Sequence, residues 1–232
     1  MPEYELPKFD PYGWPYFARL SGEEAARWVD EVYRPYFPLS ELSQEALLLM
    51  RLRRLDEGSE RLVRLRAAID AMEGADPAVR SVVERWYHAA LGYYFYCREA
   101  FGEADEAMAR ARDAVADAIG RRPFLVPMAY DCFGFSLHRA RIARNGRRWD
   151  EMEAHMDEVR GMLRGALPFC VLADGTGVRL ADIQAFYRAL PPIADEAREA
   201  IADVLDDGAR RKRASSKFLE MYRIPGVCIP YP

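Results

Sequence analysis

Two residues stand at a spacing that could support catalysis. Six residues separate Arg148 from His155 within a segment whose apolar pattern predicts a helix over about 148–164. Residues at this separation lie two turns apart on one face of a helix, so the guanidinium and the imidazole would point the same way. A solvated helix also meets that spacing by accident, and an ordinary surface position is the alternative.

The Arg148–His155 pair resembles the active-site motif of the HEPN ribonucleases, which are all-helical proteins that use arginine and histidine to cut RNA. The resemblance implies RNA cleavage by these two residues. The spacing is at the long end of the family's motif, and Trp149 stands where that family usually has a polar residue after the arginine.

The other two histidines do not stand in a metal-binding pattern. His88 lies among aromatic residues and is expected to be an interior or groove histidine. His138 follows Asp131 and Cys132, but no second histidine or cysteine stands at ligand spacing. A structural zinc site needs four such groups. The sequence therefore predicts no metal and no cofactor.

Two short motifs are assigned no chemistry. Residues 174–177 read Asp-Gly-Thr-Gly, but a calcium loop aligned on them would place Leu172 and Ile183 where carboxylates are required. A turn is the prediction there. The basic run at 210–213 could contact an acidic partner or nucleic acid, although such runs are usually solvated helix ends.

The composition limits the class of protein. Half of the 232 residues are hydrophobic, which suffices for a core, and the net charge of −4 does not favour a nucleic-acid partner. Four well-separated cysteines without a C-x-x-C pair favour a reduced compartment. No signal peptide is visible, and no stretch reaches the about 20 apolar residues of a spanning helix. We expect a cytoplasmic protein without a membrane partner.

The chain is predicted to be all-α, with antiparallel helix pairs stacked as a repeat array or an irregular bundle. Residues 1–20 hold four prolines among aromatic residues and are expected to form an extended N-terminal arm. Residues 21–166 form the helical body. Residues 167–232 form a C-terminal extension with a small hairpin or loop, further helices over about 180–189 and 192–206, and an extended tail.

Helix-capping serines, together with glycines and prolines that end helices, predict the helix boundaries within the body. Ser21 would start a helix that ends near Tyr33, and Ser40 or Ser43 would start the next. That second helix is expected to end near Gly58, with residue 59 capping its successor. Further helices are expected over about 77–101, 103–119, 124–145 and 148–164.

The middle of the chain resembles the tetratricopeptide repeats. That family's first helix carries a leucine-glycine pair and an aromatic, and its second helix carries a small-large-small pattern. The residues at the family's offsets are Leu91, Gly92, Phe95, Phe101, Ala104, Met108 and Ala111. The resemblance implies that Gly92 and Ala104 let two helix backbones approach closely while Phe95 and Met108 fill the space beside them.

The segments on either side match this family less well. The whole resemblance covers about residues 45–165. Upstream, Leu65, Ile69 and Met72 match a second helix, but the preceding helix lacks the glycine. The downstream second helix matches at Trp149, Met152, Met156 and Val159, and its partner has Ala140 where glycine is expected. Leu65 to Ala104 is 39 residues and Ala104 to Met152 is 48, whereas the family repeats at about 34.

The function that the sequence favours is a non-catalytic scaffold or adaptor that binds a protein or peptide in a groove. The inner face of the matched first helix would carry the groove residues, because repeat helices leave that face free. These residues are Trp86, His88, Ala89, Tyr93 and Tyr96. Each of these side chains could equally belong to the core. Two alternatives stay open: a HEPN-like RNA-cleaving enzyme, and an inhibitor or immunity-type protein with one dedicated partner.

Overall fold

The protein is all-α apart from one small hairpin. The computed structural model describes residues 23–171 and 175–179. Its α-helices are α2 (Glu23–Arg27), α3 (Phe37–Arg51), α4 (Leu55–Asp70), α5 (Pro77–Cys97), α6 (Phe101–Arg121), α7 (Ala129–Asn145) and α8 (Trp149–Arg164). A π-helical segment (Trp28–Tyr33) and a 3-10 turn (Arg34–Tyr36) connect α2 to α3, and a second 3-10 segment (Pro123–Met128) precedes α7.

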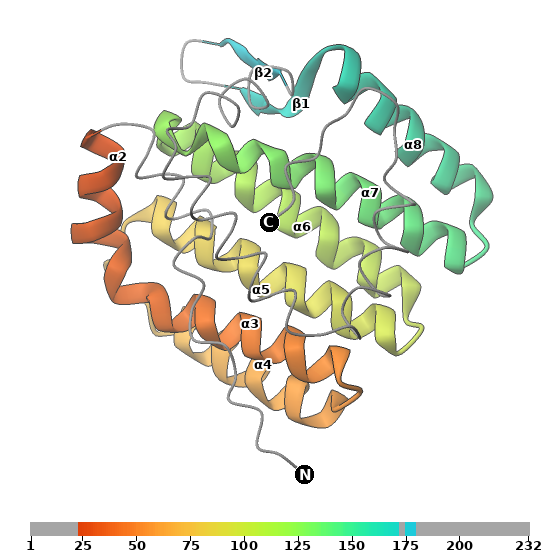
Figure 1. The fold of residues 1–232 in the computed structure, drawn as a ribbon, viewed down its shortest axis with the longest axis horizontal. Coiled ribbons are helices and arrows are strands. Elements are labelled where there is room, and N and C mark those ends of the chain that lie inside the picture. The colour runs from red at the N-terminus through yellow and green to blue at the C-terminus, as the bar shows by residue number, and fades with distance from the viewer. Residues whose placement is uncertain (1–22, 172–174, 180–232) are drawn as a thin grey trace, which may run out of the picture. The chain divides into compact units, whose positions relative to one another are not determined.

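The long helices form three consecutive hairpins, which confirms the predicted packing in pairs. The pairs α3–α4, α5–α6 and α7–α8 follow one another across the molecule (Figure 1). Both helices of the first pair pack against α5, and α6 packs against α7. The core between them is apolar, and its largest fully buried side chains include Tyr33, Met50, Leu65, Ile69, Ile119 and Phe133.

The three hairpins turn in the same way. Arg53, Glu99 and Arg147 each follow a first helix with a positive φ, of 65°, 60° and 57°. The next amide bonds back across the turn every time: Arg54 N to Leu49 O at 2.9 Å, Ala100 N to Phe95 O at 3.0 Å and Arg148 N to Ala143 O at 2.9 Å. This is the Schellman arrangement that ends many helices. The turns recur after 46 and 48 residues, so the structural repeat is longer than the tetratricopeptide period.

The helices of the first two pairs cross at small residues, as predicted for the middle hairpin. A Cβ added to Gly92 would lie 2.9 Å from Met108 Cε and 3.3 Å from the carbonyl oxygen of Ala104. In the first hairpin, a Cβ on Gly58 would lie 2.6 Å from Met50 Cγ and 3.2 Å from the carbonyl oxygen of Ala46. Gly58 of α4 and Gly92 of α5 therefore occupy opposite sides of equivalent crossings.

Two predicted boundaries in the first hairpin were wrong. Gly58 was expected to end a helix, but it lies inside α4, which begins at Leu55. Its role is the close contact with α3, and not a helix stop. Ser40 and Ser43 were expected to start a helix, but α3 begins at Phe37 and both serines are buried inside it. Their hydroxyls bond within the core instead, to Tyr33 Oη and to the carbonyl oxygen of Trp86.

A small antiparallel hairpin follows α8, where the sequence left a hairpin or a loop open. Strand β1 (Ala166–Val171) pairs with β2 (Gly177–Arg179), with Ala166 opposite Arg179 and Val171 opposite Gly177. Strand β1 packs against α6, α7 and α8. The hairpin is therefore attached to the second and third helix pairs.

Several predicted features lie outside the described residues. They are the extended arm at 1–20, the helices over about 180–189 and 192–206, the basic run at 210–213 and the C-terminal tail. Within the described ranges, none of the helices combines the length and apolar character needed to cross a membrane.

Candidate binding site

Four of the five predicted groove residues share one face of α5. Trp86, Ala89, Tyr93 and Tyr96 follow spacings of three, four and three residues, which keep side chains on one side of a helix. All four are partly exposed. We call their side of α5, with the parts of α3 and α7 that bond to it, the first-helix face.

Hydrogen bonds connect this face to the neighbouring first helices. The Ser43 hydroxyl of α3 donates to the carbonyl oxygen of Trp86 at 3.0 Å. The Asn145 side-chain amide of α7 donates to Tyr96 Oη at 2.6 Å. Side-chain hydrogen bonds thus link α5 to both of the other first helices, α3 and α7.

The tyrosines of the face are shared between core and surface. Tyr93 stacks on Tyr96 with ring centroids 6.3 Å apart, and it also packs against the core cluster around Ala46 and Met50. Burial raises the pKa of Tyr93. The ring of Tyr96 meets Phe101 edge-on at 6.1 Å. Both rings are consequently held in place and still present part of their surface outward.

His88 lies on a different side of α5 from the other four residues. Its Nε2 is 3.5 Å from a carboxylate oxygen of Glu84, and its ring meets Tyr87 edge-on. Burial lowers the pKa of His88, with Glu84 opposing the effect and Arg110 of α6 and Arg66 of α4 adding to it. These neighbours place His88 toward the second helices, α4 and α6.

Arg85 is part of the first-helix face, although it was not among the residues predicted from the sequence. Its guanidinium lies over the Trp86 ring, with Cζ 3.8 Å from the centroid. Its Nη2 donates to a carboxylate oxygen of Asp131 on α7. The side chain is only 8% exposed, and among the described residues Nε and Nη1 have no acceptor. One signal was available: Arg85 interrupts an apolar and small-residue stripe, at a position where a cation is unexpected.

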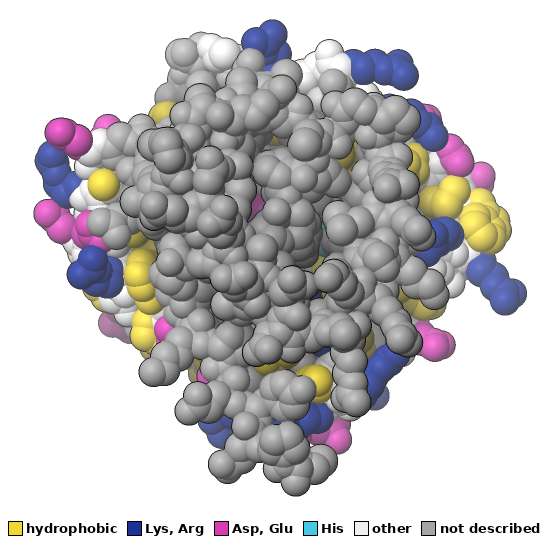
Figure 2. Space-filling view, viewed as in Figure 1, with side chains coloured by type: hydrophobic (Ala, Val, Ile, Leu, Met, Phe, Trp, Pro, Cys, Tyr) yellow, Lys and Arg dark blue, Asp and Glu magenta, His cyan; other side chains and the backbone are white. Residues whose placement is uncertain are grey.

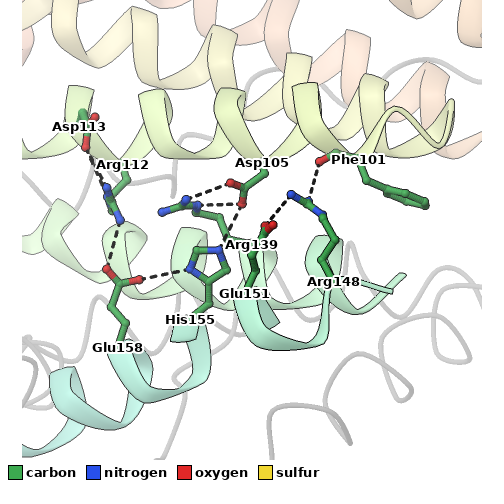
Figure 3. Close-up of polar contacts among 9 residues, drawn as sticks. All are labelled: Phe101, Asp105, Arg112, Asp113, Arg139, Arg148, Glu151, His155 and Glu158. Carbon is green, nitrogen blue, oxygen red and sulfur yellow. Dashed lines mark hydrogen bonds and ion pairs between the residues drawn. The ribbon is translucent and has the colours of Figure 1, made fainter. Parts of the chain in front are cut away.

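The candidates for RNA cleavage do not contact each other. Arg148 donates to Glu151 at 2.6 Å and to the carbonyl oxygen of Phe101 at 3.1 Å (Figure 3). His155 is 3.5 Å from Asp105 through Nε2 and 3.9 Å from Glu158 through Nδ1. Each side chain is therefore engaged in its own contacts around α8, and the hypothesis that they act together stays a prediction.

The contacts of His155 belong to a network that joins three helices. Arg139 of α7 donates to both carboxylate oxygens of Asp105 on α6, at 2.9 and 3.0 Å (Figure 3). Burial alone would raise the pKa of Asp105, but hydrogen bonds from His155 and Arg139 outweigh it and hold the pKa well below its usual range. Arg112 reaches Glu158 at 3.2 Å. This network supplies a structural function for His155 in aligning α8 with α6 and α7.

A separate shallow groove of about 330 Å³ runs between α4 and α5. Its lining is largely apolar and includes Val63, which is 67% exposed, with Tyr87 and Leu91 on the α5 side. Arg66 lies over the Tyr87 ring at 5.2 Å and pairs with Glu84. None of the five predicted groove residues lines it: four lie on the first-helix face, and His88 lies beside Glu84 outside the groove lining.

Charged side chains of both signs occur in the described part of the chain, and no metal centre is found there. Figure 2 shows acidic and basic side chains interspersed around the edge of the visible face, which agrees with 33 basic and 37 acidic residues in the chain. Within the described part of the chain, no three histidine, cysteine or acidic side chains are placed to hold a metal ion.

No protein-family model, no curated protein and no solved structure matches the chain.

Proposed function

We propose that this chain is a non-catalytic scaffold that holds a peptide or a segment of another protein on the first-helix face. The proposal includes a degenerate tetratricopeptide-like architecture. One turn geometry in all three hairpins, and small residues at the crossings of the first two, support that resemblance, although the repeat of 46 and 48 residues exceeds that family's about 34. An inhibitor or immunity-type protein would have the same role restricted to one partner.

The observation that carries the proposal is the incomplete bonding of Arg85. A buried cation normally has acceptors for its N–H groups, because a buried donor left unpaired costs about 1–3 kcal/mol. Here one carboxylate, from Asp131, serves a guanidinium whose Nε and Nη1 are buried without an acceptor among the described residues. A carbonyl or carboxylate group of a bound segment would supply the missing acceptor once local movement opens Nε or Nη1 to it.

The surroundings of Arg85 suit such a segment. Trp86 lies under the guanidinium and keeps part of its ring surface exposed. Tryptophan, tyrosine and arginine are the residues that most often dominate binding energy at protein interfaces. Tyr93 and Tyr96 continue the same row along α5, and their stacked rings are already fixed before any partner binds. A fixed ring loses little conformational entropy on binding.

The proposal is tested by selecting peptides and mapping where they bind. A random peptide library is selected against the full chain, and the affinities of enriched peptides are measured by calorimetry for the parent and its variants. Arg85→Lys keeps the charge but loses the planar stacking and the fork of donors, so we expect at least about tenfold weaker binding. Trp86→Leu should weaken binding similarly. Trp149→Phe is the matched control, because Trp149 is 56% exposed on α8.

Two results would reject the proposal. One is enrichment of peptides whose affinity is unchanged by both Arg85→Lys and Trp86→Leu while circular dichroism shows that the variants are folded. The other is cleavage of RNA by the purified chain that Arg148→Ala or His155→Ala abolishes, which would favour the enzyme hypothesis instead.

A further inference from the structure

Two cysteines that are far apart in the sequence meet in the core. Cys132 lies in the first turn of α7 and Cys170 in β1, 38 residues later. Their Sγ atoms are 3.5 Å apart, and both residues are completely buried. Cys132 Sγ also lies 3.7 Å from the carbonyl oxygen of Arg112 on α6. The two sulfurs are in van der Waals contact without a bond between them.

The strand that carries Cys170 is attached to the body by few side chains. Leu167 and Cys170 are its buried residues, and the Phe169 ring lies 3.7 Å from the guanidinium carbon of Arg112. A two-stranded hairpin is at best marginally stable alone, so β1 depends on these contacts for its position. A covalent bond at Cys170 would therefore change how firmly β1 is held.

We propose that Cys132 and Cys170 form a reversible disulfide that fastens β1 to α7 under oxidising conditions. A disulfide needs its sulfurs about 2.05 Å apart, so the pair must close by about 1.5 Å, which side-chain rotation and a small shift of the strand can supply. The bond closes a long loop, and such cross-links stabilise a fold by restricting its unfolded chain.

The oxidant is a peroxide such as hydrogen peroxide, and the step balances in two stages. One cysteine thiolate attacks a peroxide oxygen, giving a sulfenic acid and hydroxide, which takes up a proton to become water. The second thiolate then attacks the sulfenic sulfur, the S–S bond forms, and the sulfenic oxygen leaves as a second water. Together the two thiols lose two protons and two electrons, and one peroxide becomes two waters.

Burial makes this reaction selective rather than fast. The neighbouring Cys170 and burial both raise the pKa of the Cys132 thiol, so the reactive thiolate is scarce in the closed state. Cys97 is half-buried and reachable from solvent, but among the described residues no cysteine lies beside it. Peroxide should therefore oxidise Cys97 without giving it a bridge, and should join Cys132 to Cys170 when β1 opens transiently.

The full chain is reduced, treated with hydrogen peroxide, alkylated under denaturing conditions and mapped by mass spectrometry. We expect a linked peptide containing Cys132 and Cys170 that disappears after dithiothreitol, and a melting temperature several degrees above that of the reduced protein. Cys97→Ser is the matched control and should keep both effects. Cys132→Ala and Cys170→Ala should each lose the linked peptide and the rise in melting temperature. If a variant fails to fold, the peptide mapping of the parent chain still tests the proposal.

The proposal is overturned if Cys132 and Cys170 remain alkylatable after all Cys97 is oxidised. A dominant bridge from either residue to Cys97 or Cys228 would overturn it equally.

Discussion

The most direct test of the repeat is the substitution Gly58→Ala. In most helix interiors this change is favourable, because alanine is better than glycine by about 1 kcal/mol. Here the added Cβ would lie 2.6 Å from Met50 Cγ and 3.2 Å from the carbonyl oxygen of Ala46. Both obstacles are rigid: Met50 is fully buried and is touched at an inner carbon, and the oxygen belongs to the backbone of α3.

The steric cost should exceed the gain in helix propensity. Overpacking a well-filled core costs about 1–3 kcal/mol, and the rigid neighbours place Gly58→Ala toward the upper end. After the propensity gain is subtracted, we expect the free energy of unfolding to fall by about 1–2 kcal/mol. For a chain of this size that corresponds to a melting temperature lower by roughly 2–8 °C.

The assay is urea unfolding followed by circular dichroism, with Gly161→Ala as the matched control. Gly161 lies in α8, is exposed, and an added Cβ there would meet nothing within 4 Å. This control should gain about 0.5–1 kcal/mol. Opposite signs for the two variants support the crossing at Gly58. Equal stabilisation of both variants would refute the packing argument for the first hairpin.

Two further outcomes are expected. Gly92→Leu should lower the free energy of unfolding by about 1–3 kcal/mol or more, because its side chain must displace Met108; an unchanged melting temperature would contradict the middle crossing. Burial, with the positive charges of Arg141 and Arg51, lowers the pKa of His138 to about 4. In the unfolded chain the pKa of His138 is about 6.5. The unfolded state therefore binds a proton first as the pH falls below 6.5, and the free energy of unfolding decreases until the pH reaches about 4. Between pH 7.5 and 5 the free energy of unfolding of the parent should fall by about 2 kcal/mol more than that of the His138→Gln variant. Equal decreases for the two proteins in urea unfolding would disprove this.

The helix pairs could be predicted from the sequence because their apolar stripes and turn residues are local signals. The middle hairpin was the clearest, since Gly92 and Met108 stand at offsets typical of close crossings and do pack together. The error at Gly58 has a physical cause. A glycine followed by serine looks like the end of one helix and the cap of the next, and only the contact with Met50 shows that this glycine lies within α4.

The polar contacts of the candidate site were beyond prediction for a different reason. Helical spacing alone placed Trp86, Ala89, Tyr93 and Tyr96 on one face, which depends only on the geometry of α5. Predicting the pairing of Arg85 with Asp131 requires knowing how α5 and α7 are placed relative to each other. No sequence pattern encodes the distance between helices that are separated by another long helix.

The repeat itself is carried by the backbone more than by residue types. The left-handed turn position is occupied by Arg53, Glu99 and Arg147, although glycine is the residue that adopts this conformation without strain. The small residues at the crossing also exchange places. The first hairpin has alanine on its first helix and glycine, Gly58, on its second, whereas the middle hairpin has Gly92 on its first helix and alanine on its second. Either arrangement leaves room for two backbones to approach. Each of these two crossings holds one glycine and one alanine, so the combined side-chain volume is the same although the residues at the two positions differ. A motif that requires glycine on the first helix consequently recognises the middle hairpin and passes over an equivalent crossing 46 residues before it.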